Sequence, residues 1–375
     1  MIIAFDDSLT LTKDQYLQLM SLGISHFLGY IYWNVHEPEY KDRKWDALDK
    51  YFDMCGELNT NVIIRCPYGV PNNAPREWYF KARCCDLADS TTPIRAFSLW
   101  NPDATKYTVD YLVELCTRYP HIEFTPLPGV SGEVDFPVYD DNVDEFDRMF
   151  WCHDKYALQQ FKDRMRHKYG TLSNYNKFNN QTNRSWKTVG PADVKSLDVD
   201  ILDTYEWIME SAYNNWITYY DALRPFMKHD RTWISTVPRS EWKDLYLDAG
   251  LFNKDESIGK FIDHMNESGI HTNIFWYSIF NTGYLIPYHY WLIRKYKYDV
   301  WVGAETAHNI VKSSKSAIRA GCKGILVGQP YSGIYAPNQI YTRINGLEGH
   351  YTLKQAITNI QQSCILWDEA KYQHC

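Results

Sequence analysis

Two glutamates stand in similar sequence surroundings, each just after an apolar run typical of a buried strand. Glu133 follows the run that begins at Phe124 and lies in a Gly- and Pro-rich segment, and Glu305 ends the run that begins at Asp299. Glycoside hydrolysis needs such a pair, because one carboxyl group protonates the leaving oxygen and the other attacks the sugar or activates water. A Glu after a strand is also often only a helix cap or a solvated surface charge. The matching settings of the two residues favour catalysis, and we predict that Glu133 and Glu305 act together.

The runs before these glutamates belong to a regular alternation of strand and helix patterns. Segments rich in apolar and β-branched residues predict eight strands, at 2–5, 25–33, 61–67, 122–126, 232–237, 272–277, 299–304 and 325–328. Segments with a helical period lie between and after them, at 12–22, 45–58, 104–119, 151–169, 201–228, 307–320 and 352–370. This order predicts an α/β fold, a (β/α)8 TIM barrel, whose sites lie at the C-terminal strand ends. Glu133 then follows strand four and Glu305 ends strand seven.

We expect one barrel domain over residues 1–375, with two loop insertions. Residues 68–102 contain four prolines and little periodicity, which indicates a long strand-to-helix loop. Residues 171–200 are rich in Asn, Ser and Thr and lose the helical period. Both segments are expected to shape substrate preference.

Composition narrows the class of partner. The net charge is −7 and Lys and Arg are scattered, which argues against a nucleic-acid groove or an anionic membrane surface. Aromatic residues make up 16% of the chain, with 30 Tyr and 14 Trp, and such rings stack well on sugar faces. We therefore expect a carbohydrate partner, an oligosaccharide or glycan, and the sequence leaves the oligomeric state open.

Nothing in the sequence predicts a metal or a cofactor. The nine cysteines include no CxxC pair, and neither zinc-ligand spacing nor a Gly-rich phosphate loop is present. We read the cysteines as reduced thiols. The first residues lack a basic region followed by a long apolar run, so we expect a cytoplasmic protein, or one without a classical signal peptide.

Several local motifs carry a resemblance to a known family. They are Trp-Asn-Val-His-Glu-Pro-Glu at 33–39, Trp-Asp-Ala-Leu-Asp at 45–49, the Pro-to-Trp segment 71–78, and residues 161–172 followed by Asn176 and Trp186. Together they resemble the family 42 β-galactosidases of the clan A glycoside hydrolases, over roughly residues 1–350. The resemblance implies a retaining β-glycosidase of polysaccharide or oligosaccharide degradation, with Glu133 as acid/base, Glu305 as nucleophile and β-galactosides as substrates.

One departure from that family keeps a second enzyme class open. The β-galactosidases place Asn directly before the acid/base, whereas Gly132 stands here, and Ser131 or Asn101 would have to replace its contact to the substrate. The stretch 129–139 and the Asp-Lys-Tyr at 154–156 are closer to β-amylases, which invert configuration and cleave α-linked glucan. A separation of about 5 Å between the carboxyl groups implies retention, and roughly 6.5 to 9.5 Å implies inversion. A catalytically silent barrel that binds glycan is the third alternative.

Residues at other predicted strand ends complete the expected site. Tyr277 occupies the place where a clan A enzyme keeps a tyrosine that hydrogen-bonds the nucleophile, although it could be an ordinary strand residue. His36 is of a type that is more often structural than catalytic, and Glu37 could merely brace its loop. The expected substrate-binding residues are Trp33, Asn34 and His36 after strand two, Arg65 at the end of strand three, Asn101, Trp276 and Tyr277 of strand six, and Gln329 and Tyr331 of strand eight.

Overall fold

The structure is a computed structural model that describes part of the chain in detail. The described residues are 2–6, 9, 11–39, 41–68, 83–85, 93–98, 100–126, 152–192, 200–226, 231–235, 263–264, 267, 272–276, 299–304, 315, 318–319, 321–322, 324–327 and 353–372.

Eight strands form one parallel sheet. In chain order they are β1 (Ile2–Asp6), β2 (His26–Tyr32), β3 (Asn61–Tyr68), β6 (Glu123–Pro126), β7 (Arg231–Ser235), β8 (Thr272–Trp276), β9 (Asp299–Ala304) and β10 (Gly324–Val327). Their spatial order is β6-β3-β2-β1-β10-β9-β8-β7, so the first strand pairs with the last. The two outer strands of this order, β6 and β7, also contact each other. This arrangement is a (β/α)8 barrel, as the sequence predicts.

The helices also follow the predicted order. They are α1 (Lys13–Ser21), α2 (Trp33–His36), α3 (Trp45–Glu57), α5 (Pro102–Arg118), α6 (Lys155–Tyr169), α7 (Leu172–Phe178), α8 (Asp200–Leu223) and α13 (Leu353–Tyr372), with 3-10 turns η1 (Trp186–Thr188) and η2 (Arg224–Phe226). Thr12 caps α1 in a capping box with Gln15. Gly170 ends α6 at a φ of +71°, a conformation that favours glycine. None of the described helices is long and apolar enough to cross a membrane.

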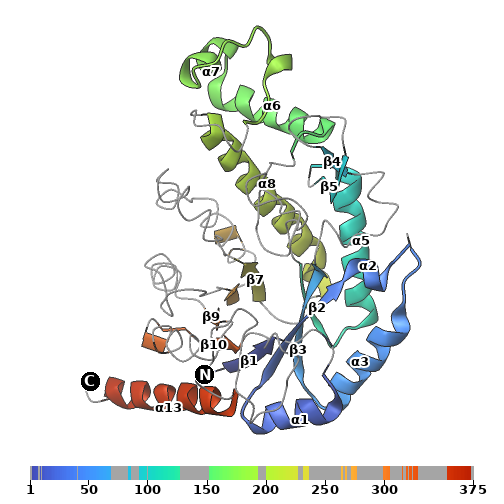
Figure 1. Cartoon of the computed structure of the whole chain (residues 1–375), viewed down its shortest axis with the longest axis vertical. Coiled ribbons are helices and arrows are strands. Elements are labelled where there is room, and N and C mark those ends of the chain that lie inside the picture. The colour runs from blue at the N-terminus through green and yellow to red at the C-terminus, as the bar shows by residue number, and fades with distance from the viewer. Residues whose placement is uncertain are drawn as a thin grey trace, which may run out of the picture.

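The alternation of side chains along the strands separates two faces. Phe27, Ile64 and Phe124 belong to a core cluster that also contains helix residues such as Phe52 and Leu115. Every second strand residue therefore points outward under the helices, and its neighbours point into the barrel. Figure 1 shows α1, α3 and α5 covering the outer face of the first strands.

Helix α8 belongs to two cores. Tyr220 and Leu223, near its C-terminal end, pack in the barrel core with α5 and the strands. Ile201 and Trp207, near its N-terminal end, pack in a second core with Phe161 and other residues of α6 and α7. With 24 residues the helix is about 36 Å long, enough to reach from one core to the other. In Figure 1 it runs from α6 and α7 down to the strands.

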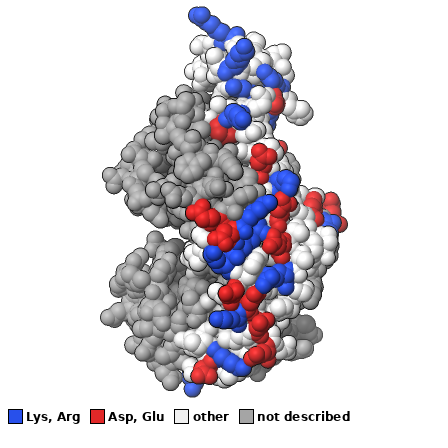
Figure 2. Space-filling model, turned by 90° about the vertical axis from the view of Figure 1, so that its right-hand side faces the viewer, with Lys and Arg blue, Asp and Glu red and all other residues white. Residues whose placement is uncertain are grey.

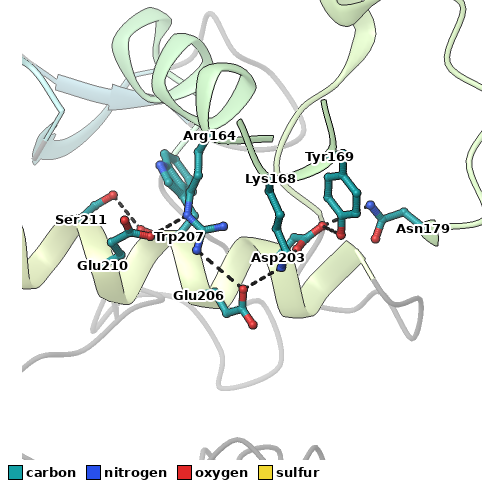
Figure 3. Close-up of polar contacts among 9 residues, drawn as sticks. All are labelled: Arg164, Lys168, Tyr169, Asn179, Asp203, Glu206, Trp207, Glu210 and Ser211. Carbon is teal, nitrogen blue, oxygen red and sulfur yellow. Dashed lines mark hydrogen bonds and ion pairs between the residues drawn. The ribbon is translucent and has the colours of Figure 1, made fainter. Parts of the chain in front are cut away.

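Polar contacts tie α6 to the N-terminal half of α8 (Figure 3). Lys168 lies 2.6 Å from the carboxylate of Asp203 and 2.8 Å from that of Glu206. Asp203 is buried and also accepts hydrogen bonds from the Tyr169 hydroxyl, at 2.7 Å, and from the Asn179 amide, at 3.1 Å. One buried carboxylate thus joins α6, α8 and the residue that follows α7.

The two predicted loop insertions contain regular structure that the sequence analysis missed. The first includes the antiparallel pair β4 (Arg83–Cys85) and β5 (Pro93–Phe97), and the second includes α7 and η1. These elements are too short for a period to be visible in the sequence. The predicted helix at 307–320 lies mostly outside the described residues, although 315 and 318–319 are helical.

The Asp203 network predicts a local loss of stability in the variant Asp203→Asn. The amide cannot accept all the bonds that the carboxylate accepts, so we expect a loss of about 2 kcal/mol, the range for hydrogen bonds to a charged group. Hydrogen exchange should show faster opening of α6 and α7 while α1 and α3 keep their protection. In the control Glu210→Gln, an exposed ion pair with Arg164 is removed, and the loss should stay below about 1 kcal/mol. Equal losses in the two variants would contradict the role of Asp203.

Candidate active site at the C-terminal ends of the strands

The predicted catalytic pair follows two strands of the barrel in sequence. The fourth strand, β6, ends at Pro126, and the seventh, β9, ends at Ala304. All neighbouring strands of the sheet are parallel, so both strands end at the same edge of the barrel. Glu133 and Glu305 themselves lie outside the described residues, and their roles stay predictions.

Other predicted site residues divide between described and undescribed positions. Tyr277, Gln329 and Tyr331 lie outside the described residues. Trp276 is the last residue of β8, and Asn34 lies in α2, directly after β2. Both therefore lie at the C-terminal edge where the sequence analysis expects them.

A polar row crosses the barrel interior near this edge. Tyr30, Arg65 and Thr125 are register partners on β2, β3 and β6. Arg65 is buried, and its guanidinium carbon lies 5.2 Å from the centre of the Tyr30 ring. The Thr125 hydroxyl is fully buried and has no hydrogen-bond partner within the described part of the chain. Such a group at a barrel mouth is suited to meet a polar ligand.

Sequence reasoning found Arg65 in this row but missed its partners. Tyr30 and Thr125 lie on the inward face because Ile64, Phe124 and Ile31 pack outward in the core. The period-two alternation of these strands was the signal that could have located them. Tyr32, two residues further along β2, is 39% exposed and contacts the Tyr30 ring edge-on, at 5.2 Å.

Glu37 anchors the chain that follows β2. Its carboxylate is completely buried and accepts hydrogen bonds from the Trp33 indole and from Nε of Arg43, each at 3.0 Å. It also accepts from the backbone N–H of Lys41 and from the Tyr107 hydroxyl. These contacts confirm the alternative in which Glu37 braces its loop, and they join that loop to α5.

Trp33 and His36 are part of the same buried cluster. The Trp33 ring stacks with the rings of Tyr107 and Tyr111 of α5, with centres 5.2 and 4.8 Å apart. His36 Nδ1 and the Tyr111 hydroxyl lie at a hydrogen-bonding distance of 2.7 Å. Both Trp33 and His36 are buried, so the structure places them between the strand end and α5. Their contact with a sugar stays a prediction.

Burial sets the protonation of this cluster. It lowers the pKa of His36 to about 4, an effect that Glu37 opposes and Arg43 reinforces. Burial likewise raises the pKa of the Tyr107 hydroxyl, and the hydrogen bond to Glu37 adds to this shift. The His36 imidazole is therefore neutral and the tyrosine is protonated at neutral pH, which leaves the Glu37–Arg43 ion pair as the charged centre of the cluster.

Asn101 has a clear structural role. It is the N-cap of α5, and its side-chain oxygen accepts a hydrogen bond from the Asp103 backbone N–H at 3.0 Å. Asn101 is buried and directly follows Trp100, a residue of the second core. A contact with the substrate, in place of the missing Asn before Glu133, stays a prediction.

The described residues include no group of three or more His, Cys, Asp or Glu placed to hold a metal ion. Six described cysteines are free thiols, and five of them are buried. Burial raises the pKa of the Cys66, Cys116 and Cys152 thiols, so these three are poor nucleophiles at neutral pH.

Several solved structures have a fold similar to that of this chain. A β-amylase catalytic domain from Paenibacillus polymyxa has a TM-score of 0.67 at 12% identity, covering 87% of this chain and 91% of that domain. A β-galactosidase from the psychrophilic Marinomonas ef1 has a TM-score of 0.64 at 12% identity, covering 99% and 60% of the two chains. A GH42 β-galactosidase from G. stearothermophilus has a TM-score of 0.63 at 14% identity, covering 98% and 57%.

The chain shares the barrel fold of these glycosidases. The resemblance to clan A glycoside hydrolases is thus confirmed at the level of the fold. No protein-family model and no curated protein sequence matches the chain. The chain spans about 60% of the length of the β-galactosidases, whereas it spans nearly all of the β-amylase domain.

The buried Glu37–Arg43 ion pair predicts that substitutions of its two members have non-additive effects on stability. Among the described residues, Glu37→Gln leaves the buried Arg43 with Glu114 as its single acidic partner, and we expect a loss of about 3 kcal/mol, the low end for breaking a buried pair. Urea denaturation followed by tryptophan fluorescence measures it. Arg43→Leu should cost less in the Glu37→Gln background than in the wild type. The control Glu57→Gln removes an exposed pair with Lys13 and should cost below about 1 kcal/mol. Additive losses at Glu37 and Arg43 would contradict the coupling.

The lowered pKa of His36 predicts a pH dependence of stability. The folded protein keeps His36 neutral down to about pH 4, whereas an unfolded histidine takes up its proton near pH 6.5. Stability should therefore fall as the pH drops from 6.5 to 4, by up to roughly 3 kcal/mol from this residue. Thermal unfolding across that range should show a flatter profile for His36→Gln. The exposed His167→Gln is the control, and an equal flattening in both variants would contradict the assignment.

Proposed function

We propose that this protein is a retaining β-glycosidase with Glu133 as acid/base and Glu305 as nucleophile. The observation that carries the proposal is the position of β6 and β9 as the fourth and seventh strands of the barrel. Glu305 is the residue after the last residue of β9, and Glu133 follows β6 by a short Gly- and Pro-rich segment. The fold similarity to glycosidases supports the same reading.

The proposed chemistry proceeds in two displacements. Glu305, ionised, attacks the anomeric carbon while Glu133 donates its proton to the leaving oxygen, and the glycosidic bond breaks. Glu133 then removes a proton from water, which attacks the same carbon and releases Glu305. The first step requires a carboxyl group that is still protonated near neutral pH, a state that an apolar environment favours, and Val130, Val134 and Phe136 lie close to Glu133 in the sequence.

We propose that β-galactosides are the substrate class. The motifs at 33–39 and 161–172 and the likeness to β-galactosidases support this choice. Arg65, with its donors in the polar row at the barrel mouth, is the described residue best placed to bind sugar hydroxyls. The other proposed substrate-binding residues are Trp33, Asn34, His36, Asn101, Trp276, Tyr277, Gln329 and Tyr331.

An inverting, β-amylase-like activity on α-linked glucan is the second candidate. It is favoured by the length of the match, since the chain covers 91% of the β-amylase domain. The Gly-Glu pair at 132–133 also fits this class better than the Asn-Glu of the β-galactosidases.

The test separates the roles of the two glutamates. Wild type, Glu133→Gln and Glu305→Gln are assayed on methyl and nitrophenyl glycosides of both anomeric configurations. Loss of a nucleophile should abolish turnover of both leaving groups, whereas loss of the acid should slow the methyl glycoside by about 10²–10⁴-fold and the nitrophenyl glycoside far less. The exposed Glu57→Gln is the matched control and should keep wild-type rates.

Proton NMR of the first-formed anomer distinguishes the candidates. Net retention on a β-galactoside supports the leading proposal, and net inversion on an α-glucan replaces it with the second. Full activity in either Glu133→Gln or Glu305→Gln would refute the catalytic pair. Glycan binding without turnover in the wild type would make the protein a recognition barrel.

A further inference from the structure

One segment of the chain has a charge opposite to that of the whole. Residues 152–192, which we name the basic knob, contain eight Lys and Arg and two Asp, a net charge of +6 in a chain of −7. The even scatter of basic residues expected from the sequence does not hold here. Figure 2 shows Lys and Arg gathered at the upper end of the molecule, over α6 and α7, whereas acidic and basic side chains alternate below it.

Five of the eight cations of the basic knob form no ion pair within the described ranges, and three of these five lie on or after α7. Arg164 and Lys168 pair with carboxylates of α8, and Arg166 pairs with Asp163. Lys177, Arg184 and Lys187 are exposed, and no acidic side chain in the described ranges pairs with them. Some exposed lysines on the barrel helices are paired, as Lys13 is with Glu57 and Lys106 with Asp110, whereas Lys50 and Lys354 have no ion pair within the described ranges. The positive electrostatic potential of the basic knob can therefore attract an anionic ligand.

Aromatic rings lie among these cations. Phe178, next to Lys177, is 59% exposed, and its ring packs at a tilt against Tyr169, with centres 5.4 Å apart. Trp186, next to Lys187, is half-buried and has the guanidinium carbon of Arg166 at 5.7 Å from its ring centre. Exposed rings beside cations suit a ligand that has both apolar faces and negative charge.

The position of the knob ties it to the candidate active site. It lies in the connection between β6 and β7, which leaves the barrel at the C-terminal end of the fourth strand. Helix α8 returns from the knob to the barrel core, and the Asp203 contacts hold the knob on that helix. The cations therefore stand on a fixed support on the side of the barrel where the strands end (Figure 1).

We propose that the basic knob binds an anionic glycan, one with sulfate or carboxylate groups, through Lys177, Arg184 and Lys187 with Phe178 as an apolar contact. The choice of a glycan rests on the proposed function, because the knob lies on the substrate side of a glycosidase barrel. A long nucleic acid fits less well, since the rest of the chain carries a net negative charge that would repel it. The enzyme would thus hold a charged polymer beside the site that cleaves it.

The experiment compares two polymers with the same backbone. Binding of dextran sulfate and of neutral dextran of equal length is measured on the full chain at 50 and 200 mM salt. The knob variant is Lys177→Gln/Arg184→Gln/Lys187→Gln. Its matched control is Lys13→Gln/Lys44→Gln/Lys106→Gln, which removes three exposed and paired lysines. Circular dichroism confirms that both triple variants are folded.

We expect wild type to bind dextran sulfate and not dextran, and to lose roughly tenfold in affinity between the two salt concentrations. The knob variant should bind at least about tenfold more weakly and lose most of this salt dependence, whereas the control stays within about twofold. Phe178→Ser should weaken binding without changing the salt dependence.

Three results would overturn the proposal. They are absence of binding to dextran sulfate, equal binding by both triple variants, and tighter binding of single-stranded DNA of equal charge. Turnover of a neutral nitrophenyl glycoside is measured in parallel. Turnover without binding at the knob removes this inference alone, and binding that follows the knob cations without any turnover removes the proposed function alone.

Discussion

The parallel sheet of eight strands, in which the first strand pairs with the last, is the constraint on which the rest of this structure depends. Because β1 pairs with β10, the backbone groups of both strands are satisfied and neither forms an edge. The pairing also fixes register, and register fixes which side chains point outward. Phe124 packs beneath the helices while its neighbour Thr125 faces the interior. The same alternation brings Tyr30, Arg65 and Thr125 into one row near the strand ends.

The buried carboxylate of Glu37 fixes the loop that follows β2. Burying a charge costs free energy unless it is paired and hydrogen-bonded, and Glu37 meets both conditions through Arg43, Trp33 and Tyr107. Apolar side chains of similar volume would stabilise the fold at least as well. Apolar contacts, however, are not directional. The four hydrogen bonds to Glu37 hold the chain after β2 in one conformation against α5. We interpret the cluster as a support that positions the mouth of the barrel.

The sequence predicted the described barrel strands and long helices well, because the strands are apolar and β-branched runs and the helices have an apolar period over several turns. The helical segment predicted over 201–228 ends earlier, because α8 stops at Leu223 and Pro225 lies in the 3-10 turn η2 that follows. The hairpin of β4 and β5 was missed, since Arg-Cys-Cys and Pro-Ile-Arg-Ala-Phe do not form apolar runs in the Pro-rich segment 68–102. The bonds of Glu37 were only partly foreseeable, because Arg43 is six residues away but Tyr107 is seventy. No sequence pattern pairs residues that the fold alone brings together.

Helix α8 joins two cores, to which the two proposals give different roles: catalysis in the barrel and binding of a charged glycan at the basic knob. In the proposed function, the distance between the carboxyl groups of Glu133 and Glu305, which follow strands four and seven, determines the stereochemical outcome. The basic knob contributes no residue to that pair, yet α8 holds it at a fixed position relative to the strand ends. If the knob binds glycan as proposed, substitutions on its exposed surface alter which glycan is bound without moving the carboxyl groups. A barrel of this kind can change its substrate through one long connection while the reaction at its centre stays the same.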